Sequence, residues 1–391
     1  MRELRNITDD IFYVGVSDRD CRLFEGQYSV HGMCYNSYVI MDERTAVMDT
    51  VDAHFVGEWL ENVAAALGGG QPDYLIVQHM EPDHSAGIAE LLRAYPDTTV
   101  VGNAKTFAMM EQFFGGEIAP RRLVVKDGET LSLGRHTLTF VFAPMVHWPE
   151  VMVTYDVCDR ALFSADGFGR FGTYSHEGDW ADEARRYYIG MVGKYGAQVQ
   201  SLLKKVSALD IKMILPLHGN PLTENLGYYI HLYDLWSSYT PEESGVAIVC
   251  ASVYGNTREA AEVLAHELGE RGVTAVIHDL STCDMAGAVA DAFRFDRLVL
   301  ATPTYNGGVF PFMRTFIDAL TERSYRSRRV ALIENGSWAP VACRVMRGML
   351  EGAKDITYAE NQLTIRSALT EENRETLRYM ADELAAPAKA E

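Results

Sequence analysis

Residues 79–84 read His-Met-Glu-Pro-Asp-His and place four side chains that can bind a metal ion within six positions. His79, Glu81 and Asp83 are spaced two residues apart, so all three can point to one side of a loop. Imidazole and carboxylate groups are both good iron ligands, and a carboxylate can bridge two ions. The segment therefore predicts a carboxylate-rich metal site that suits iron and its redox chemistry.

Three more potential ligands lie after predicted strands, as His79 does after the buried run 74–77. His147 follows a strand at 138–143, Asp166 follows one at 161–163, and His218 follows one at 211–215. Side chains on loops at strand ends can converge while the sheet keeps them rigid. Together with the first segment they supply three histidines and three carboxylates, which suit two iron ions.

The remaining histidines have a simpler interpretation, because a single histidine after a strand usually makes an ordinary hydrogen bond. This interpretation applies to His31, His54, His136, His231, His266 and His278. His176 lies in a polar loop, TYSHEGDW, and could line a pocket without binding metal.

The chain divides near residues 237–245, where the sequence SSYTPEESG interrupts the apolar pattern. We expect one domain over 1–240 and a second over 246–391. The first contains, besides the strands above, a strand at 151–155, a helix at 55–67, and a helix that begins near Ser85 and ends before Pro96.

The second half alternates β and α segments, which predicts a doubly wound parallel sheet. Strands are expected at 246–251, 273–277, 297–302, 329–334 and 362–366, and helices at 257–271, 311–321, 339–352 and 371–385. Polar loops follow the first, third and fourth strands. The first loop opens a helix, whose N-terminus can bind a phosphate, and it lacks the motifs of dinucleotide and triphosphate sites. The first and third strands flank the point where such sheets bind ligands.

Size, charge and cysteine content exclude several classes of protein. The 391 residues are enough for two domains, and 48% hydrophobic with 23% charged residues is typical of a soluble globular protein. A net charge of −19 argues against nucleic acid or an anionic membrane as the main partner. The six cysteines form no C-x-x-C pair, which excludes a rubredoxin or zinc ribbon in this sequence and favours buried, reduced thiols in a cytoplasmic protein. Neither an export signal nor a membrane-spanning run is expected.

The motifs resemble those of the flavodiiron proteins, also called A-type flavoproteins, over essentially the whole chain. The resemblance is carried by His79-x-Glu81-x-Asp83-His84, His147-Trp148-Pro149-Glu150, Ser164-Ala165-Asp166-Gly167-Phe168-Gly169, Leu217-His218-Gly219 and Tyr233-Asp234-Leu235-Trp236-Ser237. It implies an α/β fold with a metallo-β-lactamase-like αββα domain followed by a flavodoxin-like domain. Zinc hydrolases of the first fold carry a second histidine where this chain has Glu81, and that exchange favours iron.

The resemblance also implies roles for individual residues. His79, Glu81 and His147 would hold one iron, Asp83 and His218 the other, Asp166 would bridge them, and His84 would be an optional ligand or lie just behind the ligands. Trp148 and Tyr195 would line the substrate pocket. FMN would contact Ser252, Tyr254, Gly255, Asn256, Thr257, Pro303, Thr304, Tyr305, Asn306, Gly307, Asn335, Gly336, Ser337 and Trp338. Many relatives have a Gly-Trp-rich segment where this chain reads Asn-Gly-Ser-Trp-Ala-Pro, so Trp338 is either a wall of the flavin site or an anchor of the next helix.

The implied function is that of a terminal oxidoreductase. An external donor, rubredoxin or a reduced deazaflavin, would reduce FMN, and the diiron centre would reduce dioxygen to water or nitric oxide to nitrous oxide. The linker at 238–245 is short, and the resemblance implies a head-to-tail homodimer that pairs the FMN of one subunit with the metals of the other. Arg326, Arg328 and Arg329 either help an acidic donor dock or form an ordinary surface turn. Two alternatives stay open: a zinc-dependent hydrolase with an accessory flavodoxin domain, and a non-catalytic flavin electron carrier.

Overall fold

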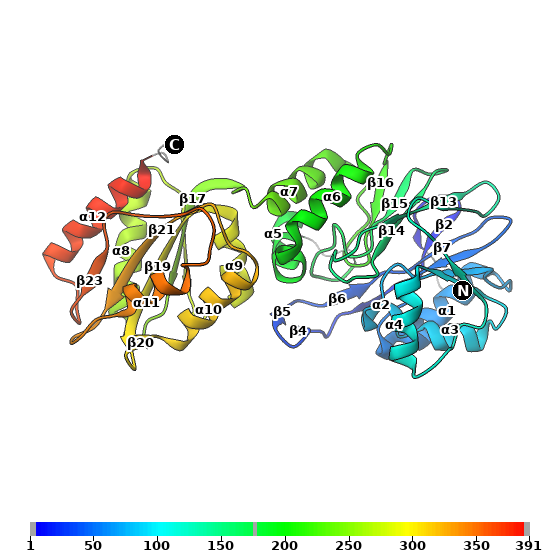
Figure 1. The fold of residues 1–391 in the computed structure, drawn as a ribbon, viewed down its shortest axis with the longest axis horizontal. Helices are drawn as coiled ribbons and strands as arrows, with labels where there is room; N and C mark the ends of the chain where they lie inside the picture. The colour runs from blue at the N-terminus through cyan, green and yellow to red at the C-terminus, as the bar shows by residue number, and fades with distance from the viewer. Residues whose placement is uncertain (1–4, 175–177, 387–391) are drawn as a thin grey trace. The chain divides into compact units, whose positions relative to one another are not determined.

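A computed structural model describes residues 5–174 and 178–386 (Figure 1). His176, which the sequence suggested as a pocket residue, lies outside the described residues. Contacts divide the chain into two compact units, Met1–Asp234 and Leu235–Glu391. This division falls within α7 (Leu226–Ser238). It lies a few residues before the interruption of the apolar pattern at 237–245, where the sequence placed the boundary.

The first unit contains two sheets. One has the order β1-β2-β7-β8-β9-β10-β11 and the other β12-β13-β14-β15-β16. The strands of the first are β1 (Arg5–Asn6), β2 (Ile11–Tyr13), β7 (Tyr38–Ile40), β8 (Ala46–Met48), β9 (Tyr74–Ile76), β10 (Thr99–Gly102) and β11 (Arg122–Val124). Those of the second are β12 (Thr130–Ser132), β13 (Thr137–Phe142), β14 (Met152–Asp156), β15 (Ala161–Phe163) and β16 (Met213–Leu215). Two small hairpins pair β3 (Val16–Asp18) with β6 (Met33–Tyr35) and β4 (Leu23–Phe24) with β5 (Tyr28–Ser29).

Helices cover the outer faces of both sheets, which gives the expected αββα layering (Figure 1). On one side lie α1 (Val56–Leu67), α2 (Pro82–Ser85), α3 (Ile88–Ala94) and α4 (Ala104–Phe114), and on the other α5 (Trp180–Tyr187), α6 (Gly196–Val206) and α7. The short helices η1 (Ala53–Phe55), η2 (Tyr188–Val192) and η3 (Gly193–Tyr195) complete the unit. Fully buried side chains from both sheets, such as Tyr38 and Ile76 opposite Phe140 and Phe163, form one apolar core between them.

Parallel pairing brings the functional loops to common sheet edges. β15 pairs in parallel with β16, so the loops that carry Asp166 and His218 leave the sheet at the same edge. β8 pairs in parallel with β9, which places Asp49 beside the loop that carries His79. The strands are short and fully buried, so their ends are fixed by apolar packing on both faces.

The second unit is a doubly wound parallel sheet with the order β18-β17-β19-β21-β22. Its strands are β17 (Glu243–Cys250), β18 (Ala275–Asp279), β19 (Phe295–Tyr305), β20 (Gly308–Val309), β21 (Arg328–Asn335), β22 (Ile356–Tyr358) and β23 (Leu363–Ile365). α8 (Asn256–Glu270) and α12 (Glu371–Ala385) cover one face, and α9 (Met285–Arg294), α10 (Pro311–Glu322) and α11 (Ala342–Met349) the other (Figure 1). The strand order reverses between β17 and β19, as expected for the flavodoxin-like arrangement.

Three local features differ from the sequence expectations. Helix α9 was missed, although its residues are amphipathic and Ala288, Ala292 and Phe293 are buried on one face. The expected helix at 339–352 is shorter and begins at Ala342, after Pro340. The expected fifth strand at 362–366 corresponds to β23, and a further short strand, β22, was not predicted. The two are separate because the N–H groups of Glu360 and Asn361 donate to the Glu383 carboxylate (2.7 and 2.9 Å) instead of joining the sheet.

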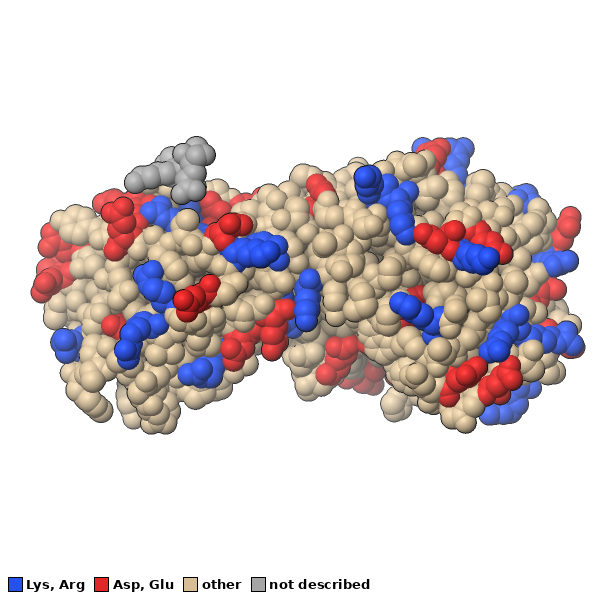
Figure 2. Space-filling view, viewed as in Figure 1, with Lys and Arg blue, Asp and Glu red and all other residues tan. Residues whose placement is uncertain are grey.

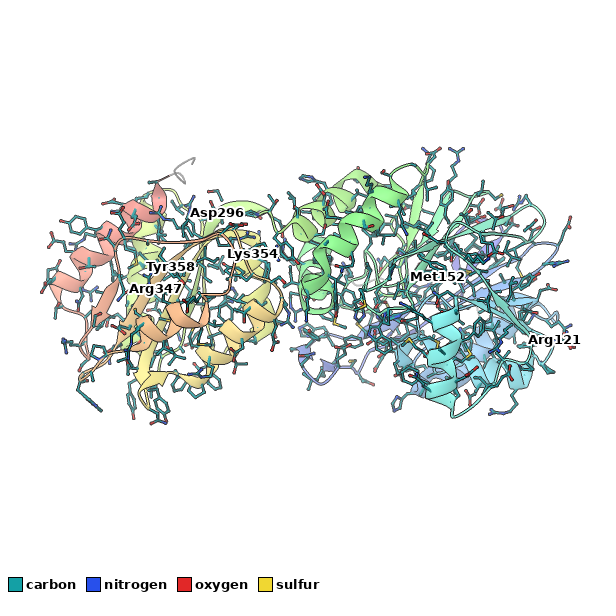
Figure 3. All side chains as sticks on the ribbon, in the orientation of Figure 1. Arg121, Met152, Asp296, Arg347, Lys354 and Tyr358 are labelled. Atoms are coloured by element: carbon teal, nitrogen blue, oxygen red, sulfur yellow. The ribbon has the colours of Figure 1, made fainter. Side chains whose placement is uncertain are left out.

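A cation–π contact stabilises the edge of the second unit that ends with β22. The Arg347 guanidinium lies 3.8 Å from the centre of the Tyr358 ring, which connects α11 to β22 (Figure 3). The contact covers an aromatic face that the edge strand would otherwise leave to solvent.

Arg328 is a buried cation at the start of β21, beside β22. It is 2% exposed, and its guanidinium donates to the carbonyls of Phe295 and Tyr239 (both 2.7 Å) and of Phe293. It therefore satisfies carbonyl groups at the junction of α9 with β19 and in the segment that follows α7.

The three arginines of the 326–329 turn are thus not a free basic surface. Arg329 pairs with Glu383 at 2.5 Å, and Arg326 lies over the ring of Tyr239 at 4.1 Å. A donor-docking role is wrong for Arg328, because its side chain is buried, and the other two side chains are already engaged within the chain.

Charge and thiol distribution complete the picture. Figure 2 shows acidic and basic side chains interspersed over the viewed face. All six cysteines are free, but only Cys34, Cys250 and Cys343 are buried, so the expectation of buried thiols holds for three of them. Within the described part of the chain, no helix combines the length and apolarity that crossing a bilayer requires.

Replacing Arg328 with Met should lower the free energy of unfolding by about 2–4 kcal/mol, because several buried carbonyls lose their donor. Urea unfolding of the full chain, followed by circular dichroism and tryptophan fluorescence, measures the change. Arg326→Met is the matched control, and it should cost less than about 1 kcal/mol, since that half-buried side chain makes only a cation–π contact with Tyr239 and one hydrogen bond to the Ser324 carbonyl. Equal unfolding midpoints for the two variants would contradict the assignment.

His136 is a buried histidine away from the metal-binding segment. Its Nδ1 lies 3.0 Å from Asp156 Oδ2 and its Nε2 lies 3.4 Å from Asp10 Oδ2. The hydrogen bond with Asp156 raises the pKa of His136 above its ordinary value, although burial opposes the shift. Through Asp10 on one side and Asp156 on the other, His136 connects the N-terminal segment to the second sheet of the unit.

The His136 contribution to stability should therefore decline as the pH rises. A histidine whose pKa is raised by folding contributes fully below its unfolded value of about 6.5 and loses that contribution above its folded value. The stability difference between the wild type and His136→Gln, measured by urea unfolding, should be larger at pH 6 than at pH 9. A difference that grows with pH would refute this interpretation.

Candidate functional site

The loop after β9 carries the first metal-binding segment and is fixed by Asp49. The Asp49 carboxylate accepts hydrogen bonds from the backbone N–H of Gln78 (2.7 Å), the side-chain amide of Gln78 (2.8 Å) and the N–H of His79 (3.3 Å). Burial raises the pKa of Asp49 to about 6, against the lowering effect of the Gln78 donors. Pro82 then begins α2, with Glu81 at the N-cap position, so the loop turns sharply into the helix.

One group of ligand atoms gathers around Glu81. Glu81 Oε2 lies 3.1 Å from His79 Nε2 and 3.1 Å from His147 Nε2. Asp166 Oδ2 lies 3.1 Å from His147 Nε2 and 3.4 Å from His79 Nε2. These four residues each offer one ligand atom within 4.8 Å of the others.

A second group gathers on the other side of Asp166. The Nε2 atoms of His84 and His218 are 3.0 Å apart, and Asp83 Oδ2 lies 3.3 Å from His218 Nε2. Asp166 Oδ1 lies 3.2 Å from His84 Nε2 and 3.9 Å from His218 Nε2. Each oxygen of Asp166 thus faces a different group. His84 points into the second group as directly as His218 does, which favours a ligand over a residue behind the ligands.

The donor atoms fit two metal ions. Metal bonds of about 2.0–2.2 Å place neighbouring ligand atoms about 3.0–3.4 Å apart, and the contacts above fall mostly in that range. Both oxygens of Asp83 and Oδ1 of Asp166 are buried without a hydrogen bond in the described part of the chain. The Nε2 atoms of His84 and His218 face each other and cannot both donate a hydrogen bond. Bound metal ions would accept the lone pairs of these nitrogens and of the carboxylate oxygens. The mixture of nitrogen and carboxylate oxygen suits iron.

Electrostatics within the cluster favour bound positive charge. Burial alone lowers the pKa of His79, but the Asp166, Glu150 and Glu81 carboxylates raise it well above its usual value. Burial raises the pKa of Glu81, yet hydrogen bonds with His147 and His79 bring it below its usual range. The carboxylates therefore remain ionised while the imidazoles are drawn toward the cationic form, and metal ions can replace those protons.

Buried hydrogen bonds orient two of the histidines. His79 Nδ1 lies 2.9 Å from Glu150 Oε1, and His218 Nδ1 lies 2.7 Å from the Cys34 carbonyl. The loop of His218 is held in turn by Asn36, whose side-chain amide donates to the carbonyls of Pro216 and Gly219 (2.8 and 2.7 Å). In both histidines Nε2 is left to face the cluster.

Glu25 is a residue that sequence reasoning missed. It lies in the hairpin of β4 and β5, beside Glu81. Although the Glu25 side chain is exposed, partial desolvation and then the charge of Glu81 raise its pKa to about 7. The preceding residue, Phe24, packs its ring 5.7 Å from the ring of His218. No motif surrounds Glu25, so only the path of the hairpin reveals its position.

The aromatic neighbours agree in part with the implied pocket. The Trp148 ring lies 5.3 Å from that of His79, as the resemblance implied for a pocket residue. Tyr195 ends η3 and occupies the N-cap position of α6, where its side chain makes no capping hydrogen bond. Two tyrosines pack on the cluster: Tyr35, with its ring 6.0 Å from that of His218, and Tyr187, with its ring 5.4 Å from that of His218 and its hydroxyl buried without a hydrogen bond to the described residues. Sequence reasoning missed Tyr187 because a buried helix aromatic has the pattern of a core residue.

The second unit contains a cavity of about 630 Å³ at the carboxyl ends of β17, β19 and β21. Its lining residues are Ser252, Val253, Tyr254, Asn256, Thr257, Pro303, Thr304, Tyr305, Asn306, Gly307, Asn335, Gly336, Ser337, Trp338, Ala339 and Ser367. All the residues expected to contact FMN are among them except Gly255, which precedes α8 with a φ of 95° that favours glycine.

Side-chain hydrogen bonds join the loops of this cavity. Thr304 Oγ1 accepts from the N–H groups of Val341 and Ala342 (3.0 and 3.2 Å). Asn335 and Ser367 exchange two hydrogen bonds (2.9 and 3.2 Å). Ser367 was not predicted, because it follows β23 without a recognisable motif. Trp338 is 81% exposed, which excludes the helix-anchor interpretation.

The cavity has no charged side chain among its lining residues. A phosphate there would be bound by backbone N–H groups, hydroxyls and the N-terminus of α8. Exposed aromatic rings, Tyr254 (92% exposed) and Trp338, stand beside it. This combination suits a flat aromatic cofactor with a phosphate tail.

Comparison with known proteins agrees with both sites. Residues 33–219 match a family model described as ODP family beta lactamase, and residues 247–340 match one described as a flavodoxin domain. A nitric oxide reductase of Moorella thermoacetica is 28% identical over 92% of this chain and 92% of its own length.

Two solved structures share the whole fold. A flavodiiron protein of Giardia intestinalis has a TM-score of 0.91 at 27% identity and covers 98% of this chain and 96% of its own. Rubredoxin oxygen:oxidoreductase of Desulfovibrio gigas has a TM-score of 0.90 at 25% identity and covers 98% of each chain. The matched family models include every ligand of the two metal groups and most of the flavin loops. The chain therefore belongs to the flavodiiron proteins, oxidoreductases that carry FMN and a non-haem diiron centre.

Proposed function

We propose that this chain is a terminal reductase that accepts electrons from an external donor at FMN and uses them at the diiron centre. Its substrates would be dioxygen, reduced to water, and nitric oxide, reduced to nitrous oxide. The names of the Moorella and Desulfovibrio relatives include both activities, nitric oxide reduction and oxygen reduction.

The observation that carries the proposal is the position of Asp166 between the two ligand groups. One of its oxygens faces His79 and His147, and the other faces His84. A single carboxylate shared in this way supports two adjacent ions that act as one redox unit, rather than two independent structural sites.

The ligand sets follow from the two groups. His79, Glu81, His147 and Asp166 would hold one iron, and Asp83, His84, His218 and Asp166 the other. When bound, two ferrous ions and reduced FMN would together supply the four electrons that convert dioxygen to two waters. The coupling of two nitric oxide molecules to nitrous oxide needs only two of these electrons.

The protein's own side chains control water around this centre. His79, His84, Asp166 and His218 are at most 1% exposed, and the rings of Trp148, Phe24 and Tyr187 pack against the ligands. This packing limits water and strengthens electrostatic contacts inside. The Glu25 side chain lies beside Glu81 at the edge of this centre.

The partner interactions extend this proposal. A head-to-tail homodimer would place the FMN of one subunit near the metals of the other. It is supported by exposed aromatic rings in each unit, Tyr254 and Trp338 beside the flavin cavity and Phe113, stacked on Trp148, beside the metal groups. Rubredoxin or a reduced deazaflavin would supply electrons in the cytoplasm, where free cysteines such as those of this chain persist.

Replacing His79 with Ala should lower gas consumption by at least about 100-fold, because the first iron loses a ligand and its link to Glu150. An electrode that measures dioxygen and nitric oxide uptake by the reduced enzyme, together with iron analysis, gives the result. His54→Ala is the matched control; that side chain is 87% exposed and should be dispensable.

Two outcomes would overturn the proposal. If the wild type, expressed without excess zinc, contained two zinc ions and hydrolysed esters or nucleic acid, the chain would be a hydrolase. If reduced flavin were oxidised only slowly by either gas, without turnover, the chain would be an electron carrier.

Replacing Asn256 with Asp should weaken FMN binding at least about tenfold, because a carboxylate beside the phosphate adds like-charge repulsion at the N-terminus of α8. Flavin fluorescence during titration of the flavin-depleted full chain measures the dissociation constant. Asn373→Asp makes the same substitution at the start of α12, away from the cavity, and should leave FMN affinity unchanged. Similar affinities for all three proteins would place the phosphate elsewhere.

A further inference from the structure

We propose that Glu150 makes the two iron positions electronically unequal, so that the ion held by His79 is the one more strongly stabilised in the ferric state. This inference rests on the proposed diiron function and concerns a residue that is not itself a ligand. Glu150 acts through His79 and is therefore a positioning residue.

The Glu150 side chain is built into the interior behind His79. Its Oε1 lies 2.9 Å from His79 Nδ1 and accepts a hydrogen bond of 2.8 Å from the N–H of Met80. The side chains of Glu150 and His79 are both 0% exposed. Oε2 of Glu150 is buried without a hydrogen bond to the described residues. The carboxylate is consequently directed at the imidazole and little compensated elsewhere.

The backbone around Glu150 is held as firmly as its side chain. Asn103 donates from its side-chain amide to the Glu150 carbonyl at 2.5 Å, while its own Oδ1 caps α4 by accepting from Lys105 and Thr106. α4 therefore fixes the position of Glu150. A carboxylate with no freedom to turn away keeps its hydrogen bond to His79 whatever binds at Nε2.

The histidines of the second group are supported differently. His218 Nδ1 faces a neutral carbonyl, that of Cys34, at 2.7 Å. His84 Nδ1 is buried without a hydrogen bond to the described residues. The arrangement places a carboxylate behind His79 but only a dipole behind His218.

This difference has a defined chemical consequence. A carboxylate that accepts the Nδ1 proton increases the electron density at Nε2 and makes the imidazole a stronger donor to its metal. In a site from which water is excluded, the negative charge of Glu150 also interacts more strongly with the bound ion than it would in water. The ion bound to His79 should therefore be harder to reduce than its neighbour, and the half-reduced centre should hold its ferric ion at the His79 position.

Glu150→Gln separates this effect from a purely structural one. The amide keeps the size of the side chain and a carbonyl that can accept the Nδ1 proton, so the His79 tautomer is retained. Only the charge is lost, which makes the support of His79 resemble that of His218.

The experiment uses full-length protein loaded with ⁵⁷Fe and FMN, examined by Mössbauer and electron paramagnetic resonance spectroscopy during a redox titration. We expect Glu150→Gln to retain two irons per chain, with one of the two Mössbauer signals changed. The midpoint potential of that iron should shift upward, and the range in which the half-reduced form accumulates should become narrower. Glu150→Leu, which also removes the acceptor, should lose iron from one position.

The control is Glu334→Gln, which removes a buried carboxylate from the second unit, 5% exposed, without touching a ligand. Its iron spectra should match the wild type. Wild-type spectra and potentials in a Glu150→Gln protein that keeps its melting temperature and its iron would overturn the inference while leaving the proposed function intact. Zinc in place of iron in the wild type would instead overturn the proposed function.

Discussion

A carboxylate buried in a protein interior needs positive charge around it, and the need to satisfy Asp166 underlies the organisation of the first unit. Its oxygens face two separate groups of imidazole and carboxylate atoms, all almost fully buried. Three buried carboxylates so close together would repel one another strongly without cations between them. The loops that end β9, β15 and β16 must therefore meet at fixed distances, and the two apolar sheets supply the rigidity that this requires.

The second unit solves the opposite electrostatic problem. Its cavity is lined by uncharged side chains and presents the N-terminus of α8, so an anionic phosphate can be bound without a paired cation. Hydrogen bonds from Thr304 and between Asn335 and Ser367 join the surrounding loops, which preserves the shape of a cavity whose strands end at different heights. One chain thus combines a site that concentrates charge and one that avoids it, and each suits its own cofactor.

The sequence predicted the parts of this design that are written locally. Spaced ligand residues after buried strands, and polar loops after parallel strands, led to the metal groups and to nearly the whole cavity lining. Residues that contribute through long-range packing could not be recognised: Glu25 reaches Glu81 only because a hairpin folds over it, and Tyr187 reads as a core aromatic. Arg328 was read as a surface cation, because a sequence does not show which carbonyls a fold leaves without donors.

The choice of metal follows from the same physics and not from the fold alone. An αββα scaffold can present the same loop with mostly nitrogen donors, and then suits zinc. Here Glu81 lies between His79 and His147, and Glu150 adds a further negative charge behind His79. Each carboxylate near a metal stabilises the higher of two oxidation states, which has no meaning for zinc but determines the behaviour of iron. Carboxylates in and behind the ligand set thus suit a rigid scaffold to electron transfer, and under our proposal their unequal distribution would make two neighbouring ions electronically unequal.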